Sequence, residues 1–381
     1  LLSLIYYAII SLKVGIIMNF IRENILKIVT FIVILVVIII VFSFVFKGTG
    51  SSKANTYAQM EENLKNAAQR YATKNTKVLP KSEKEQSKIN TDTLVNAEYI
   101  KELYSIDDEN VKCSGYVLIS KNGDSYTYIP HIKCGKYYET KTIADYIETN
   151  EQLATADDGL YKYGEKYVYR GENPKNFLKM GEKLYRIIEI TEDNELKLIS
   201  TTKYQDSFVW DDRYNIEKDR NYGINDYAKS RLKEGLEEVY KSDYFTEGEK
   251  SIIIPHSICI GKRYLDDQSI DGKTECATVY PDQKVSLINV SEYMRASLDS
   301  NCTNATSESC SNYNYFENIS SYLKTITAVA DNTYQIYKIN YGIADASNAS
   351  TTVAVYPVVY IDKNTLYAAG DGTEENPYTV R

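Results

Sequence analysis

The longest apolar stretch of the chain covers residues 28–46 and contains no charged side chain. As a helix with a rise of about 1.5 Å per residue it would be about 30 Å long, which matches the hydrocarbon core of a bilayer. A stretch of this length is rare in a buried soluble helix. A cleaved signal peptide is shorter and ends in a small-residue site, which residues 47–50 (KGTG) do not provide. The pattern therefore predicts a retained membrane anchor over residues 18–47, which contacts the membrane through residues 28–46.

A second apolar stretch covers residues 1–17 and is interrupted by Lys13. The first methionine is Met18. We therefore expect the natural start at Met18 and interpret residues 1–17 as upstream read-through, with an additional membrane helix as the alternative.

The charges and cysteines around the anchor predict its orientation. Three basic residues precede the span and two follow it closely, which favours an N-terminus on the inner side. All six cysteines lie after the span, and an even number of cysteines suits an oxidising exterior. We expect a single-pass protein of the cell membrane with an extracellular C-terminal region. The alternative is a cytoplasmic domain with six free thiols.

Apolar residues recur at helical spacing in three segments after the anchor. The spacing of three and four residues predicts a helix over 55–74, a shorter helix over 92–104 and an amphipathic helix over 226–241. The apolar set of the first helix is Tyr57, Met60, Leu64, Ala67, Ala68 and Tyr71, and that of the third is Ala228, Leu232, Leu236, Val239 and Tyr240.

Alternating patterns predict a β-hairpin from residues 114–120 and 125–132. Asn122-Gly123 between the two arms suits the positive φ angles of a type I′ turn. A hairpin that pivots there places Cys113 opposite about residue 132, so a disulfide between Cys113 and Cys134 is geometrically reasonable. By sequence proximity the remaining pairs are Cys259–Cys276 and Cys302–Cys310, although six cysteines allow fifteen connectivities.

The predicted helices and strands divide the expected extracellular region into two parts. Residues 48–140 contain the first helices and the hairpin, and residues 141–156 read as a linker or short helix. From about Asp157, short strands are predicted over 159–171, 177–180, 183–190 and 195–201, and a β-rich run covers 351–361. Together with the helices this pattern predicts an α+β protein, with a C-terminal domain of short strands and loops over 157–381.

Composition excludes several functions. A net charge of −8 and a pI of about 5.2 argue against binding to nucleic acid, which requires a basic patch. The chain has 36 Tyr against 9 Phe and 1 Trp, and five of the Phe lie in the first 46 residues. Amphipathic Tyr outside the membrane and Phe within it support the division into anchor and extracellular region. An AT-rich genome is an alternative cause of the Tyr excess.

The N-terminal part resembles type IV pilins and pseudopilins over about residues 18–140. The resemblance rests on residues 66–71 (NAAQRY), residues 93–103 (TLVNAEYIKEL) and the CSGYV motif at 113–117. It implies an anchor, a helix and a hairpin bracketed by a disulfide. Residues 20–23 (FIRE) lack the Gly or Ala that precedes the cleavage site in prepilins.

The C-terminal part, about 157–381, is similar to an uncharacterised domain of surface proteins from low-GC Gram-positive bacteria. The matching segments are 176–188, 209–215, 285–297, 355–360 and 370–378, and the Gly-Val-Arg-Pro that is usual in that family reads Ala354-Val-Tyr-Pro357 here. Its mixture of short strands and long loops resembles C-type-lectin-like and sulfatase-modifying folds.

Few residues suggest catalysis. Trp210, Asp211, Asp212 and Arg213 form the best polar cluster, because paired carboxylates can bind Ca²⁺ or act as acid and base, although such a run more often caps a helix or forms a salt bridge. Residues 371–376 (DGTEEN) are rich in oxygen ligands but are typical of a β-turn. His256 and Cys259 could pair as base and nucleophile only if the cysteine were free. We therefore expect no catalytic residues, no metal site and no cofactor.

These observations predict a membrane-anchored, extracellular, pilin-like surface protein whose C-terminal domain binds a surface glycan or a protein, in the manner of an adhesin. Loops rich in Tyr, Asn and Ser make adaptable recognition surfaces. One alternative is an enzyme that processes envelope polymers with Asp211 and Asp212. Another is a structural minor pilin or secretion-system subunit.

Overall fold

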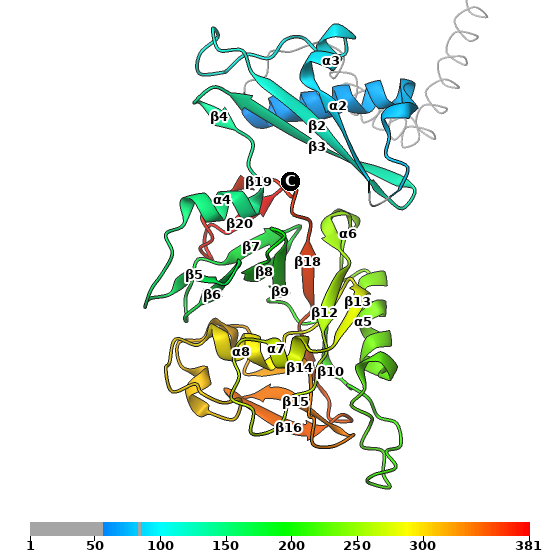
Figure 1. Ribbon diagram of the computed structural model, residues 1–381, viewed down its shortest axis with the longest axis vertical. Coiled ribbons are helices and arrows are strands. Elements are labelled where there is room, and N and C mark those ends of the chain that lie inside the picture. The colour runs from blue at the N-terminus through cyan, green and yellow to red at the C-terminus, as the bar shows by residue number, and fades with distance from the viewer. Residues whose placement is uncertain (1–55, 83–84) are drawn as a thin grey trace, which may run out of the picture.

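The computed structural model describes residues 56–82 and 85–381. This part of the chain is a mixed α+β structure, mostly of strands, with seven helices, so the predicted α+β class is confirmed. It forms two bodies stacked along the long axis (Figure 1). The predicted anchor and the apolar segment 1–17 lie outside the described residues. Within the two described ranges, no helix is both long and apolar enough to span a bilayer.

The smaller body, residues 56–140, packs one long helix on an antiparallel sheet. Helix α2 (Tyr57–Lys74) confirms the predicted amphipathic helix, because Met60, Leu64, Ala67 and Ala68 are all buried. The sheet order is β1-β2-β3-β4, with β1 Gln86–Asn90, β2 Ser114–Asn122, β3 Ser125–Cys134 and β4 Tyr138–Glu139.

The predicted hairpin is formed by β2 and β3, with its turn one residue later than expected. Asn122 pairs with Ser125, so the two-residue loop is Gly123-Asp124, and Gly123 has a φ of +59°. Ser114 pairs with Lys133 at the other end. The register therefore places Cys113 directly opposite Cys134, and the two form a disulfide.

The helix expected over 92–104 is wrong in length. Helix α3 covers only Thr91–Asn96, and Glu98 lies in the left-handed region with a φ of +60°. Tyr99 N donates to Leu94 O and Glu98 N donates to Val95 O, which is the Schellman pattern that ends a helix. The left-handed residue that ends a helix is usually Gly, so a glutamate at position 98 did not indicate that the helix ends there. The apolar residues after it still pack on the core as a loop.

The larger body, residues 141–381, is built on a nine-stranded sheet. Its strand order is β11-β18-β9-β8-β7-β20-β19, with β6 paired to β8 and β5 paired to β6. The bounds are β5 Gly159–Tyr163, β6 Lys166–Arg170, β7 Phe177–Met180, β8 Lys183–Ile190, β9 Leu196–Ser200, β11 Ile253–Ile254, β18 Val358–Ile361, β19 Tyr367–Ala369 and β20 Tyr378–Val380. The strands predicted between 159 and 201 are thus confirmed, and the run 351–361 divides into two strands around Pro357.

Smaller sheets and helices complete the larger body (Figure 1). A three-stranded sheet contains β14 Tyr322–Ala328, β15 Gln335–Asn340 and β16 Ile343–Asn348. Two strand pairs join β10 Gln205–Phe208 to β17 Val353–Val355, and β12 His256–Cys259 to β13 Val279–Gln283. The helices are α4 Ile143–Asn150, α5 Arg231–Lys241, α6 Glu247–Ile252, α7 Lys273–Cys276 and α8 Val290–Ala296.

Two predicted boundaries in the larger body need correction. The helix expected over 226–241 begins only at Arg231, because the hydroxyl of Ser230 caps Lys233 N at 3.2 Å and ends a separate 3-10 turn (Tyr227–Lys229). Ala228, expected on the buried face, is exposed. The expected linker 141–156 holds helix α4, which belongs to the core of the larger body because its residues Ile143, Ala144 and Ile147 are buried there.

Arg381 forms a second connection between the two bodies, in addition to the backbone. We name this contact the clasp. Arg381 exchanges backbone hydrogen bonds with Leu366, and its guanidinium forms an ion pair with Glu61 on α2. Glu61 is fully buried and also accepts from Tyr138 Oη and Thr140 Oγ1. The clasp therefore joins the end of the larger sheet to the first helix of the smaller body.

Three disulfides join the six cysteines in the expected pairs: Cys113–Cys134, Cys259–Cys276 and Cys302–Cys310. Such bonds persist in secreted and surface proteins and are rare in the reducing cytosol. The disulfides are consistent with an extracellular or otherwise oxidising location.

Candidate functional site

The polar cluster at 210–213 ties three segments of the chain together. Trp210 and Asp211 are both fully buried. The Asp211 carboxylate accepts hydrogen bonds from the Arg213 guanidinium at 2.6 Å and from the backbone N–H groups of Arg213, Ile224 and Arg231. Asp212 lies at the surface and forms an ion pair with Arg231 at 2.7 Å. The two carboxylates therefore have separate partners, and Asp211 has a structural role.

The other residues that the sequence singled out also have local partners. Cys259 is bound to Cys276, so the thiol needed for a pair with His256 is consumed. The His256 ring stacks on Tyr360 with centroids 3.8 Å apart. In the 371–376 turn, hydrogen bonds from the Thr373 N–H and hydroxyl lower the pKa of Asp371. The described residues contain no group of three or more His, Cys, Asp or Glu side chains placed to hold a metal ion.

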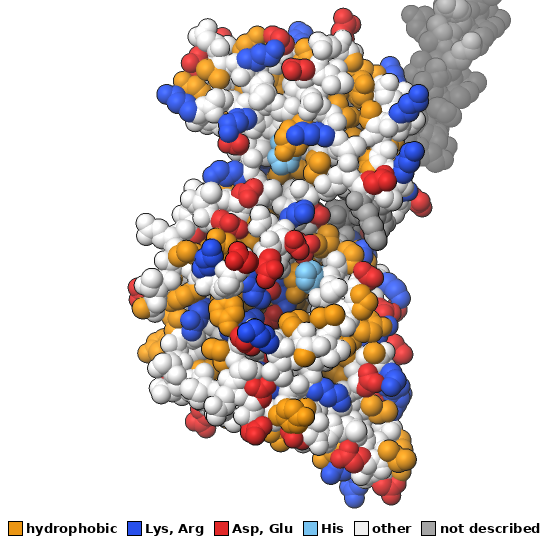
Figure 2. Space-filling model, in the orientation of Figure 1, with side chains coloured by type: hydrophobic (Ala, Val, Ile, Leu, Met, Phe, Trp, Pro, Cys, Tyr) orange, Lys and Arg blue, Asp and Glu red, His pale blue; other side chains and the backbone are white. Residues whose placement is uncertain are grey.

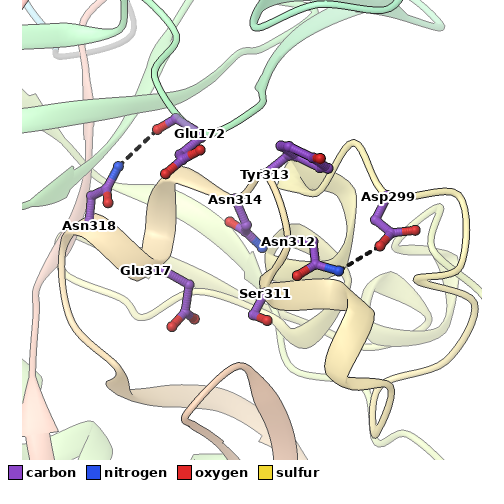
Figure 3. Close-up of a pocket in the computed structure, with 8 residues that line it drawn as sticks. All are labelled: Glu172, Asp299, Ser311, Asn312, Tyr313, Asn314, Glu317 and Asn318. Carbon is purple, nitrogen blue, oxygen red and sulfur yellow. Dashed lines mark hydrogen bonds between the residues drawn. The ribbon is translucent and has the colours of Figure 1, made fainter.

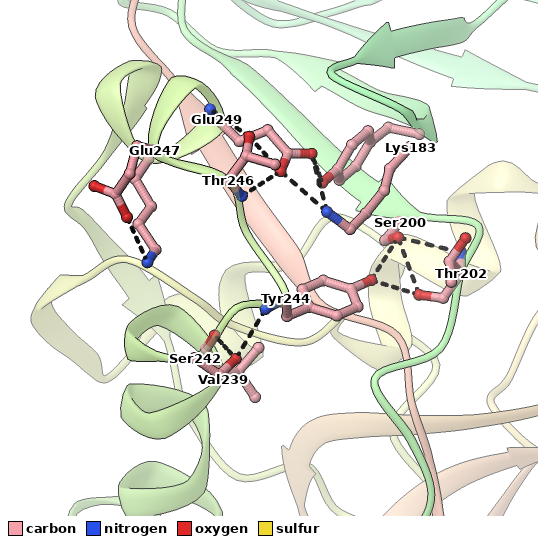
Figure 4. A network of polar contacts seen from close by, with 11 residues as sticks. Lys183, Ser200, Thr202, Val239, Ser242, Tyr244, Thr246, Glu247 and Glu249 are labelled. Carbon is pink, nitrogen blue, oxygen red and sulfur yellow. Dashed lines mark hydrogen bonds and ion pairs between the residues drawn. The ribbon is translucent and has the colours of Figure 1, made fainter. Parts of the chain in front are cut away.

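A buried polar network beneath α6 is also structural (Figure 4). Glu249 accepts from Lys183 Nζ at 3.0 Å, from Tyr185 Oη at 3.3 Å and from Thr246 N at 2.7 Å, completing a capping box. Burial raises the pKa of the nearby Tyr244 to about 12, and its hydroxyl donates to Thr202 O. The network fastens α6 to the sheet, and its Glu249 side chain is buried.

The candidate site is a surface cleft of about 460 Å³ in the larger body, which we name the cleft. Most of its lining comes from one loop, residues 311–318, and the remainder from the loop after β6 and the loop after α8 (Figure 3). Every lining residue has a polar side chain: Glu172, Asp299, Ser311, Asn312, Tyr313, Asn314, Glu317 and Asn318.

Hydrogen bonds and a disulfide fix the shape of the cleft. The Cys302–Cys310 bond closes the loop that precedes the lining segment. Asn314 is buried, and its side-chain amide donates to Tyr293 O at 2.9 Å and to Cys310 O at 2.7 Å. Asn318 donates to the backbone oxygen of Glu172 at 3.0 Å across the cleft. The polar lining is therefore held in place by the fold.

Three carboxylates set the charge of the cleft, and its lining includes no Lys or Arg. Burial raises the pKa of Glu317, which accepts a hydrogen bond from Tyr293 Oη at 2.6 Å. The amide of Asn312, at 2.7 Å, and the N–H of Asn301 lower the pKa of Asp299. The cleft thus offers anionic and amide groups that can accept several hydrogen bonds from one polar ligand.

One exposed tyrosine lines the cleft, and two others lie against each other outside its lining. Tyr313 lines it, is 60% exposed and has a φ of +49°. Tyr341 is 69% exposed with a φ of +46°, and the next residue, Gly342, packs so closely on Ser311 that an added Cβ would lie 2.3 Å from the serine Cβ. Tyr322 meets the Tyr341 ring at 4.6 Å. Left-handed backbone is costly for bulky residues and is concentrated at functional sites.

The sequence contains a signal for this site that is not a catalytic motif. Residues 311–318 read SNYNYFEN, a dense run of Asn and Tyr of the kind that forms recognition loops. Comparison with known protein families, curated proteins and solved structures finds no match to this chain. The proposed function below therefore rests on the chemistry of the cleft.

Proposed function

We propose that the protein is a membrane-anchored, extracellular, pilin-like surface protein whose larger body binds a glycan in the cleft. The observation that carries the proposal is the combination of carboxylate and amide acceptors with one exposed aromatic ring, that of Tyr313, in one fixed cleft. A sugar offers several hydroxyl donors and an apolar face, which match these two components. The disulfides support an extracellular setting, and the apolar stretch at 28–46 supports an anchor.

Replacing Tyr313 with Ala should weaken glycan binding by about tenfold or more, because truncation of an exposed aromatic anchor removes a large part of the contact energy. The measurement is binding of the full chain to a panel of immobilised bacterial and host glycans. Tyr264→Ala is the matched control, since Tyr264 is exposed to a similar extent (58%) and does not line the cleft. Equal binding by the Tyr313→Ala variant and the unaltered chain would reject the cleft as the site.

The charge of the cleft predicts a preference among glycans. With three carboxylates and no basic residue in the lining, the cleft should bind amine-bearing or neutral sugars and exclude acidic ones. We expect a glucosamine oligomer to bind more tightly than its fully N-acetylated form, and added salt to reduce the difference. Competition between the two oligomers at fixed pH measures this preference, and tighter binding of a uronic-acid polymer would contradict it.

The enzymatic alternative is tested on the same cleft. Asp211 and Asp212 are engaged in ion pairs, so we assign the enzymatic alternative to the carboxylates of the cleft. Glu317, whose pKa burial raises, would then be the acid. Release of reducing ends from a bound glycan, lost in Glu317→Gln, would favour an enzyme over a binding protein.

A further inference from the structure

A rigid loop projects from the larger body between β10 and α5, and we name residues 211–224 the finger. It is the green loop that extends beyond the start of α5 at the lower end of the molecule (Figure 1). Its two arms meet where Asn215 N donates to Arg220 O at 2.7 Å. The residues between them, 216–219, form the tip.

The finger is fastened on both sides of its base. Asn215 is buried, and its amide donates to Gly223 O at 2.9 Å and to Thr333 O at 3.2 Å, while its side-chain oxygen accepts from Glu217 N. On the other side, Trp210 N and Asp211 N both donate to Ala349 O. These hydrogen bonds fix the base of the finger on the larger body and so set the direction in which the tip projects.

An apolar side chain is presented at the tip. Ile216 is 89% exposed, the largest exposure among the large hydrophobic residues described, and the neighbouring Tyr214 is 54% exposed. The residues that follow, 217–220 (EKDR), carry two acidic and two basic side chains. Figure 2 shows hydrophobic side chains among charges of both signs at this end of the molecule. Because these four side chains carry no net charge, they would not attract the tip to an anionic lipid surface. They suit a protein surface that carries charges of both signs.

A matching groove lies at the far end of α5. It has a volume of about 210 Å³, and its apolar wall comes from Leu236, Tyr240 and Val285. Cavities of about 150 Å³ accept a benzene molecule, so this groove can hold one isoleucine side chain. Its rim carries two acidic and two basic residues: Glu237, Lys241, Asp282 and Lys284. The groove thus has room for the Ile216 side chain and an apolar wall for it to contact. Its rim carries two acidic and two basic residues, as does the 217–220 segment beside Ile216.

We propose that the finger of one copy of this chain inserts Ile216 into the groove of a second copy. The finger precedes the first residue of α5 and the groove is formed near the last, so the two are separated by most of a helix about 16 Å long and cannot meet within one molecule. The contact joins two different surfaces, so it is head-to-tail: the first copy keeps a free groove and the second copy keeps a free finger. It is independent of glycan binding.

The test uses the full chain purified in detergent and exploits its cysteines. All six native cysteines are in disulfides, so an introduced cysteine is the only free thiol. After mild oxidation, a mixture of the Ile216→Cys and Lys241→Cys variants should give a covalent dimer. Lys363→Cys, an exposed position outside the groove, is the matched control and should not cross-link to Ile216→Cys.

A second measurement distinguishes a specific contact from cross-linking by random collision in solution. Ile216→Asp should weaken self-association in sedimentation by about tenfold or more, because a charge replaces the buried apolar group, and it should leave glycan binding unchanged. Absence of the mixed dimer overturns the proposal. So does efficient cross-linking of Ile216→Cys to itself, which would show a symmetric contact between two finger tips.

Discussion

Replacing Glu292 with Ala is expected to destabilise the larger body by about 3–5 kcal/mol, the cost of leaving a buried charge without its partner. Glu292 on α8 and Lys197 on β9 form an ion pair in which both side chains are about 95% buried. Burial by itself lowers the pKa of Lys197, but Glu292, together with Tyr360 and Glu189, outweighs burial and raises the pKa overall. Without Glu292 the buried ammonium group loses its ion-pair partner and keeps only the weaker attraction of Glu189, so it must remain charged at a cost or lose its proton. Chemical denaturation at pH 7 measures the loss.

The same substitution removes part of the helix cap, since Glu292 also accepts from Asn289 N at 2.8 Å. Two variants separate the contribution of the ion pair from that of the helix cap. Glu292→Gln keeps a side-chain acceptor for the cap and should fall between Ala and the unaltered chain. The double variant Lys197→Met with Glu292→Leu should recover most of the lost stability, because it removes both charges and fills the space. A loss below about 1 kcal/mol for Glu292→Ala would show that the pair is not isolated from water.

Replacing Lys324 with Met is expected to stabilise the protein at pH 7 by a few kcal/mol and to remove a dependence of stability on pH. Lys324 is 2% exposed in the three-stranded sheet, and Lys338 is its cross-strand partner. The one hydrogen bond of its ammonium among the described residues goes to Thr351 O, at 3.3 Å. Burial, reinforced by Lys338, lowers the pKa of Lys324 to about 7.

The direction of the pH effect follows from proton binding. The unfolded chain keeps the lysine proton up to a pH of about 10.5, whereas the folded chain loses it near pH 7. The unfolded state therefore binds more protons in this window, and stability should rise with pH, by about 1.4 kcal/mol per unit. Urea unfolding at pH 7, 8 and 9 should show the rise in the unaltered chain and a weaker one in Lys324→Met. The exposed control Lys363→Met should keep the full slope, and parallel curves for all three proteins would refute the assignment.

Local patterns predicted most of the elements that depend on neighbouring residues. The periodicity of α2 and the alternation of β2, β3 and β8 each reflect a face packed against a core, and these elements were found. The errors arose where one backbone group decides the outcome. Glu98 ends α3 in a left-handed conformation that a glutamate does not usually adopt. Ser230 caps α5, which therefore begins at Arg231, five residues after the expected start.

The sequence shows the 311–318 run that supplies most of the cleft, but not the two segments that complete it, because those are separated from that run along the chain. The backbone of Gly171 joins these segments to the run, donating to Ala296 O at 2.8 Å and accepting from Tyr315 N at 2.7 Å. These bonds bring Glu172 and Asp299 beside the 311–318 loop. By contrast, the cluster at 210–213 was visible as a motif, but its contacts show that it holds the base of the finger.

The clasp gives the molecule a direct route for mechanical load. A pull on the cleft or the finger acts on the larger body, whose last residue grips α2 at Glu61, near the first turn of that helix. Tension can therefore pass from the larger sheet to the start of α2 through an ion pair, in parallel with the covalent connection at residues 140–142. The covalent connection continues from β4, which pairs with hairpin strand β3, so the hairpin lies on that second route and is closed by its own disulfide. The clasp therefore shares the load with the hairpin for as long as its ion pair holds, and beyond that point the backbone connection carries the load alone.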